Sequence, residues 1–235
     1  MGSVLKRQTV IEREDIAELA RKASILLAIE DAVDEIALEL GIENPGYSIE
    51  WPEAADTIRV YIDADAGCLR EKVVDDLRIE VVCRRTEQNI RHIYREIALG
   101  MARKAAEILR QYVFGDREYI AIVLDSGSTI VLEGEPGKVV VPWIPKTFFT
   151  CHTPPHTQQP LFSRKDVESL IEILANRGFG SCVVTPYACL AVYRCGPFTL
   201  NDYFKLVSIA RDYGYADKDV IDEAGLESVE GYIFS

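Results

Sequence analysis

The stretch that organises the chain is Phe148-Phe-Thr-Cys-His-Thr-Pro-Pro-His-Thr-Gln-Gln-Pro-Leu-Phe-Ser-Arg-Lys-Asp-Val167. It contains His152 and His156, two of the three histidines in the chain. An apolar run leads into it, and a periodic segment typical of a helix begins at its Ser163. Two histidines after a predicted strand, a proline-rich loop and Asp166 in the first turn of the next helix supply ligand types that hold a metal ion. This stretch therefore predicts both a strand–loop–helix arrangement and a candidate metal site.

The composition is that of an ordinary globular protein. The chain has 235 residues, of which 48% are hydrophobic and 27% charged, so it makes one large domain or two small ones. No apolar run approaches the roughly 18 to 20 residues that a membrane span needs. The opening residues show no signal-peptide core behind their basic side chains. We therefore predict a cytoplasmic protein with no membrane partner.

The charge balance argues against nucleic-acid binding. The formal net charge is −12, whereas binding to phosphates requires a basic face. The six cysteines include no Cys-x-x-Cys pair, which excludes the usual zinc-finger and thioredoxin patterns. Buried free thiols are the default expectation for them. Scarce Asn and Gln beside plentiful Glu, Arg and Ile hint at a thermophilic source, in which an intracellular disulfide would not be surprising.

Residues 1–85 are predicted to form a mainly helical, in part mixed, N-terminal region of unknown role. Apolar residues at three- and four-residue steps predict a long amphipathic helix over 12–40. Alternation predicts a strand over 58–62, and 69–77 is predicted to be helical. The segment 79–83 either completes that helix or forms a short strand. The acidic turn that lies between these segments lacks the glutamate of an EF-hand loop, so we interpret it as a plain loop.

Residues 86–213 are predicted to form an α+β domain, followed by an acidic C-terminal tail over 214–235. Regular short strands with Gly and Pro between them indicate a largely antiparallel, curved sheet flanked by helices. The predicted helices cover 86–112, 167–175 and 199–213, and the predicted strands cover 118–124, 129–132, 138–141, 147–151, 181–185 and 190–194.

A catalytic zinc site requires three protein ligands and a position left open for water. It also requires a carboxylate that takes the proton of that water and a donor that steadies the developing oxyanion. His152 and Asp166 supply ligand types, Glu118 supplies a carboxylate and Ser163 supplies a hydroxyl. The residues leave the third ligand unassigned.

This constellation resembles the JAMM metalloproteases of the MPN-domain superfamily, over about 87–212. Their pattern is a glutamate at the start of an early strand, then His-x-His-Pro, then Ser-x-x-Asp at a helix start. Here Glu118-Tyr-Ile-Ala-Ile-Val-Leu follows a long helix, His152-Thr-Pro-Pro follows a strand, and Ser163-Arg-Lys-Asp166 opens a helix. The resemblance implies an MPN/cytidine-deaminase-like curved mixed sheet flanked by helices.

The resemblance also implies roles for individual residues. Glu118 would be the general base, His152 and Asp166 would be zinc ligands, and Ser163 would support the oxyanion. The second histidine of the family falls on Pro154, which cannot coordinate a metal. His156 replaces it only if the two prolines turn the chain back, because four extended residues span roughly 12 Å and ligands of one zinc lie about 3 to 4 Å apart.

Two functional hypotheses follow from the resemblance. In the first, the chain is a degenerate relative that is non-catalytic or weakly active and acts in assembly or protein binding. In the second, it is an active zinc-dependent peptidase or isopeptidase that acts on ubiquitin-like conjugates, with His156 as the replacement ligand.

Two interpretations without zinc also remain. Ser163 and Asp166 are a ready-made helix N-terminus, in which the hydroxyl caps and the carboxylate favours the positive end of the helix dipole. Cys151 beside His152 suggests a cysteine nucleophile, although adjacent strand residues point to opposite faces.

Overall fold

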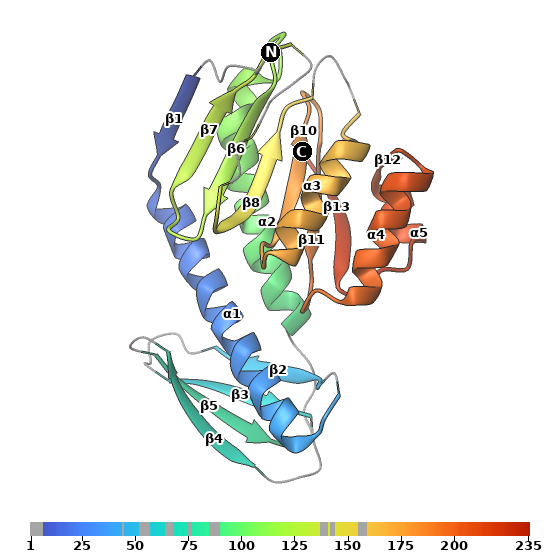
Figure 1. Cartoon of the computed structure of the whole chain (residues 1–235). Coiled ribbons are helices and arrows are strands. Elements are labelled where there is room, and N and C mark those ends of the chain that lie inside the picture. Colours follow the sequence, from blue (N-terminus) through green and yellow to red (C-terminus); the bar gives the residue numbers. More distant parts are fainter. Residues whose placement is uncertain are drawn as a thin grey trace. The chain divides into compact units, whose positions relative to one another are not determined.

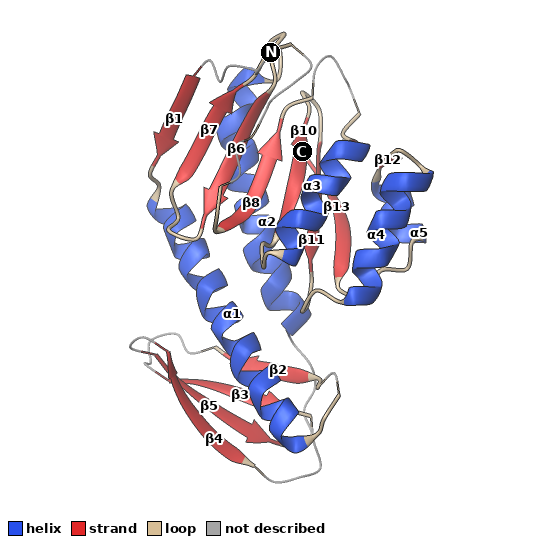
Figure 2. Ribbon diagram, viewed as in Figure 1, coloured by secondary structure: helices blue, strands red, loops and turns tan. Residues whose placement is uncertain are grey.

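A computed structural model describes residues 7–43, 45–51, 57–63, 68–74, 77–84, 90–136, 141, 144–154 and 159–235. The predicted mixed α and β fold is confirmed (Figure 2). The chain forms two compact units, which divide after Ala23 and after Ile93 and not near residue 85, where the sequence predicted a boundary. Unit 1 comprises Met1–Ala23 and Tyr94–Ser235, and unit 2 comprises Ser24–Ile93. Unit 2 is therefore an insertion in the sequence of unit 1.

Unit 1 contains a seven-stranded sheet in the order β1-β7-β6-β8-β10-β11-β13 (Figure 1). Every neighbouring pair is antiparallel except β8 and β10, which are parallel. The prediction of a largely antiparallel sheet is thus confirmed. The strands are β1 (Arg7–Ile11), β6 (Tyr119–Leu124), β7 (Thr129–Glu133), β8 (Thr147–His152), β10 (Gly180–Val184), β11 (Cys189–Arg194) and β13 (Val229–Phe234).

Helices cover both faces of this sheet. The helix α2 (Ile90–Leu109), continued by the 3-10 turn η1 (Arg110–Tyr112), lies on one face. The other face carries α3 (Arg164–Ala175), α4 (Leu200–Asp212) and α5 (Lys218–Glu223). Their buried apolar side chains share one core with Val183, Leu190 and Val192 of the sheet.

The parallel pair determines where the candidate site forms. Parallel neighbours require a crossover connection, and α3 is the crossover between β8 and β10. Such a connection brings the carboxyl end of the first strand close to the start of the helix. A short second ladder, β9 (Phe162–Ser163) with β12 (Tyr215–Ala216), lies at the start of α3.

The predicted acidic tail over 214–235 is wrong. This segment contains β12, α5 and β13, and β13 forms an edge of the main sheet by pairing with β11. The acidic residues are concentrated in and around α5, whereas Tyr232-Ile233-Phe234 supplies the apolar and aromatic side chains that favour a strand. Because the segment is acidic on average, its apolar end was not recognised as a strand.

Unit 2 contains most of α1 (Glu14–Leu40) and a four-stranded sheet in the order β2-β3-β5-β4. The long helix predicted over 12–40 is confirmed by α1. The prediction that the N-terminal region is mainly helical is wrong, because its other described elements are strands. The strands are β2 (Tyr47–Glu50), β3 (Thr57–Ile62), β4 (Leu69–Val74) and β5 (Leu77–Cys83).

The predicted helix over 69–77 is wrong, because this segment forms β4 and the start of β5. In β4 the face towards α1 carries Arg70 and Lys72, which form ion pairs with Glu39 and Glu35 of that helix. Leu69 and Val73 are exposed instead. This reverses the usual apolar-inside alternation, so the pattern did not indicate a strand.

The cysteines also differ from the default expectation of free thiols. Cys68 is bonded to Cys83, and Cys151 is bonded to Cys182. Cys189 and Cys195 are free and buried. The predicted strand over 138–141, except for Val141, lies outside the described residues, as does Thr86, at which the second helix was predicted to begin.

Candidate functional site

The candidate site forms where β8 ends and α3 begins. His152 is the last residue of β8, and Ser163 is the N-cap of α3. Because α3 is the crossover to the parallel neighbour of β8, residues eleven positions apart in the sequence lie at the same end of the sheet. His152 and Asp166 are thereby brought together, as the sequence predicted.

The atom Nε2 of His152 lies 3.6 Å from Oδ1 of Asp166. This distance is too long for a hydrogen bond. It is close to the separation of two ligands on one zinc ion, which is about 3.4 Å when each lies about 2.1 Å from a tetrahedral centre. The pair therefore has a spacing that suits a shared metal ion.

The other oxygen of Asp166 has a structural role. Oδ2 accepts a hydrogen bond of 2.7 Å from the backbone N–H of Ser163, and Ser163 Oγ accepts one of 3.4 Å from the N–H of Asp166. These two bonds form a capping box at the start of α3. One carboxylate thus fixes the helix start with one oxygen and presents the other to His152.

Burial favours the neutral form of His152. The residue is only 9% exposed, and its ring meets Phe162 edge-on at a centroid distance of 6.4 Å. Burial lowers the pKa of this imidazole, and the charge of Asp166 raises it by a smaller amount. Neutral imidazole is the form that coordinates metals.

Strand register places Glu118 on the same face as His152. Ile120 of β6 pairs with His152, and the ladder continues through a 2.9 Å bond from the N–H of Thr153 to the carbonyl of Tyr119. Glu118 precedes Ile120 by two residues, so alternation directs both side chains to one face. Such diagonal neighbours are about 7 to 8 Å apart, so half-buried Glu118 belongs to the same end of the sheet.

The Ser-x-x-Asp pattern is a weak sign of a zinc site in this chain. Thr199 and Asp202 repeat it at the start of α4, where Thr199 Oγ1 accepts a 3.1 Å bond from the N–H of Asp202. There the carboxylate joins the helix to residues 227–228 and contacts no histidine that the structure describes. Capping alone therefore accounts for exposed Ser163, and its oxyanion role stays a prediction.

The third ligand is not found among the described residues. Half-buried Pro154 lies two residues after His152, and His156 is in segment 155–158, which is outside the described part. Within the described ranges, no group of three or more His, Cys, Asp or Glu side chains could hold a metal ion. His152 and Asp166 thus form two-thirds of the predicted ligand set.

The disulfide beside the site was missed by sequence reasoning. Cys151 and Cys182 are paired across the parallel strands β8 and β10. The sulfur of Cys182 lies 3.9 Å from the carbonyl oxygen of Ala102 in α2, on the face opposite His152. The signal was available, because strands that flank a crossover helix are adjacent and each carried one cysteine. The alternative of a Cys151 nucleophile is wrong here, because a bonded sulfur is not a thiol.

Tyr215 is a second neighbour of the site that the sequence did not indicate. It pairs with Ser163 in the short β9–β12 ladder and is 43% exposed. It lies in the segment predicted to be a tail, which explains why no role was assigned to it.

Comparison with protein-family models finds no match, and comparisons with curated proteins and with solved structures also find none. In the part of the chain that the structure describes, no helix is both long and apolar enough to span a membrane.

Proposed function

We propose that the chain contains a JAMM/MPN-like domain with a degenerate zinc site, which acts in protein binding or assembly and has little or no catalytic activity. The observation that carries this proposal is the incomplete ligand set. His152 and Asp166 approach each other, but Pro154 occupies the position of the second histidine. A site with two protein ligands holds zinc weakly, since catalytic zinc sites have three.

A second candidate is an active zinc-dependent peptidase or isopeptidase that acts on ubiquitin-like conjugates. The observation that favours it is the 3.6 Å separation of His152 Nε2 and Asp166 Oδ1. This spacing and the buried, neutral imidazole suit a metal ion, and His156 would supply the missing ligand. Bound zinc would supply a water of lowered pKa and would polarise the substrate carbonyl.

In that second candidate, the residues of the chain have distinct tasks. His152, His156 and Asp166 would hold the ion, and the capping box keeps Asp166 in place. Glu118 would take a proton from water as general base and pass it to the leaving amine. The hydroxyl of Ser163 would donate its hydrogen to the oxyanion while its oxygen still accepts from the N–H of Asp166.

Zinc content distinguishes the two candidates. We expect the untagged wild-type protein to contain well below one zinc per chain, measured by mass spectrometry of the metal after dialysis against zinc. His152→Ala is expected to abolish the residual binding, because His152 is the nitrogen ligand of the described pair.

His92→Ala is the matched control, because His92 is the remaining histidine and lies exposed on α2. About one zinc per chain that is lost in both His152→Ala and His156→Ala, but kept in His92→Ala, would refute the degenerate-site proposal and favour the peptidase. Zinc lost equally in all three variants would indicate binding unrelated to this site.

A further inference from the structure

The solvent-facing side of α4 carries an apolar stripe. Leu200 is 71% exposed, Phe204 57% and Val207 37%, and Tyr213 just beyond the helix is 57% exposed. The opposite side of the helix is already buried, with Leu206, Ile209 and Ala210 in the core. A helix with apolar residues on both sides is typical of one that packs against a second surface.

The spacing of the stripe indicates what kind of surface this is. Leu200, Phe204 and Val207 are separated by four and three residues, and Arg211 continues the series after four more. Alternating steps of four and three form the seam of two packed helices. The partner surface is therefore expected to be a helix that runs along α4.

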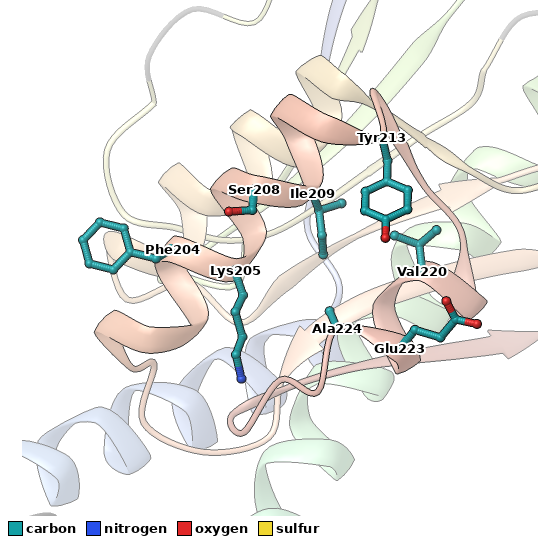
Figure 3. A pocket seen from close by; sticks show the side chains of 8 residues that line it. All are labelled: Phe204, Lys205, Ser208, Ile209, Tyr213, Val220, Glu223 and Ala224. Atoms are coloured by element: carbon teal, nitrogen blue, oxygen red, sulfur yellow. The ribbon is translucent and has the colours of Figure 1, made fainter.

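A cavity of about 410 Å³ extends this surface towards α5 (Figure 3). Apolar side chains from both helices line it, among them Phe204, Ile209 and Val220. In Figure 3 the ring of Phe204 projects away from α5 and the ring of Tyr213 lies at the other end of the cavity. Phe204 is thus at the centre of the exposed stripe and at the margin of the recess.

Charged side chains of opposite sign lie at the two ends of α4, Glu227 beside its start and Arg211 near its end. At the start, Asn201 Nδ2 donates a 2.8 Å hydrogen bond to Glu227 Oε1 on the exposed surface. At the end, Arg211 is exposed and donates to both carboxylate oxygens of the adjacent Asp212, at 2.6 and 2.9 Å. Because both side chains are on the surface, this ion pair is worth little and can be exchanged for one with a partner. The midpoint of the stripe lies between Phe204 and Val207. An antiparallel copy of α4 centred there places Arg211 of each copy beside Leu200 and Glu227 of the other.

We infer that α4 is a self-association surface, on which a second copy of this chain packs its own α4 in antiparallel orientation about a two-fold axis. Phe204 and Val207 form the apolar centre, and two Arg211–Glu227 pairs close the ends. A two-fold arrangement uses the same patch on both subunits, so Arg211 of each copy meets Glu227 of the other. The inference does not depend on the zinc site.

The contact is small, so the dimer is expected to be reversible. The stripe runs along only about 17 Å of helix at 1.5 Å per residue, so we expect the area buried to be at the low end for specific interfaces. Repulsion between two chains of net charge −12 also opposes association. Moderate salt should therefore favour the dimer by screening that repulsion, whereas high salt should weaken the Arg211–Glu227 pairs.

The test is the mass of the full chain by light scattering and sedimentation, over about 1 to 200 μM, a range that covers micromolar dissociation constants. We expect a concentration-dependent dimer for the wild type. Phe204→Asp should be monomeric throughout, whereas Phe114→Asp should behave as the wild type, because Phe114 is 82% exposed in a turn remote from α4 in the sequence. A wild type that is monomeric at every concentration would overturn the inference, as would equal weakening by both variants.

Charge reversal tests the orientation. Arg211→Glu and Glu227→Arg should each raise the dissociation constant at least about five-fold, since each places like charges together at both ends. The double variant should return it to near the wild-type value. A double variant as weak as the single ones would refute the antiparallel arrangement, and a thermal melt of each variant would verify that the fold is retained.

Discussion

Asp202→Asn is expected to lower the free energy of unfolding by about 3 to 5 kcal/mol, because it removes a fully buried carboxylate on which three donors converge. One oxygen accepts from the N–H of Glu227 at 2.9 Å, and the other accepts from the N–H and the hydroxyl of Ser228 at 2.7 and 2.5 Å. An amide would turn an NH₂ group towards at least one of these donors. Urea unfolding followed by circular dichroism would measure the loss.

The control for Asp202 is Asp217→Ala, which removes a simpler helix cap. Asp217 caps α5 through one bond, from the N–H of Val220 at 3.0 Å, so the loss should be about 1 kcal/mol. If the two variants lost equal amounts, Asp202 would have no more than a capping role, and the attachment of α4 to the segment before β13 would have to come from packing alone.

Replacing both Cys151 and Cys182 with alanine is expected to lower the free energy of unfolding by about 3.5 kcal/mol. The bond joins residues 31 apart, and a cross-link of that length restricts the unfolded chain by roughly this amount. The measurement is urea unfolding of the wild type and the double variant without reductant. Cys189→Ala is the matched control, because it removes a buried sulfur from the neighbouring strand β11 without removing a bond.

A thiol titration in denaturant is an independent measurement of the same feature. Two of the six cysteines are free in the structure, so two thiols per chain should react before reduction and six after it. Six reactive thiols without reductant would contradict both disulfides and, with them, the expected stabilisation.

The elements that sequence reasoning predicted correctly are those in which one physical signal dominates. In α1 and α3, the apolar period matches the buried side, and in α3 a capping pair also marks the first turn. For β6, β8, β10 and β11, short apolar runs lie between turn residues, and these strands are buried along most of their length.

The elements that were missed are those in which tertiary contacts outweigh the local pattern. β4 carries its basic residues towards α1, so its polarity is explained only by Glu35 and Glu39. β1 has four exposed residues and forms a strand because it pairs with the edge of the sheet at β7. Neither partner can be inferred from the segment itself.

For the candidate site, the sequence placed His152 and Asp166 in one ligand set, because the end of a strand and a capped helix start could each be identified from residues, and the two side chains lie 3.6 Å apart. The sequence did not predict that α3 is a crossover between parallel strands. It did not predict that the bonded sulfur of Cys151 lies on the opposite face, or that Tyr215 pairs beside Ser163. These contacts depend on which strands become neighbours. The order of the strands depends on packing across the whole sheet and not on any one segment.

The insertion of unit 2 between β1 and β7 affects the order in which the protein folds. On the order of a hundred residues separate these paired strands, and the entropy lost in closing so long a loop slows their pairing. Unit 2 has its own sheet and the Cys68–Cys83 bond, with shorter separations along the chain. If it folds first, much less free chain remains between β1 and β7. The amides of β1 should then be among the last to gain protection in a pulsed hydrogen-exchange experiment, and early protection there would show that the edge strand forms without help from the insertion.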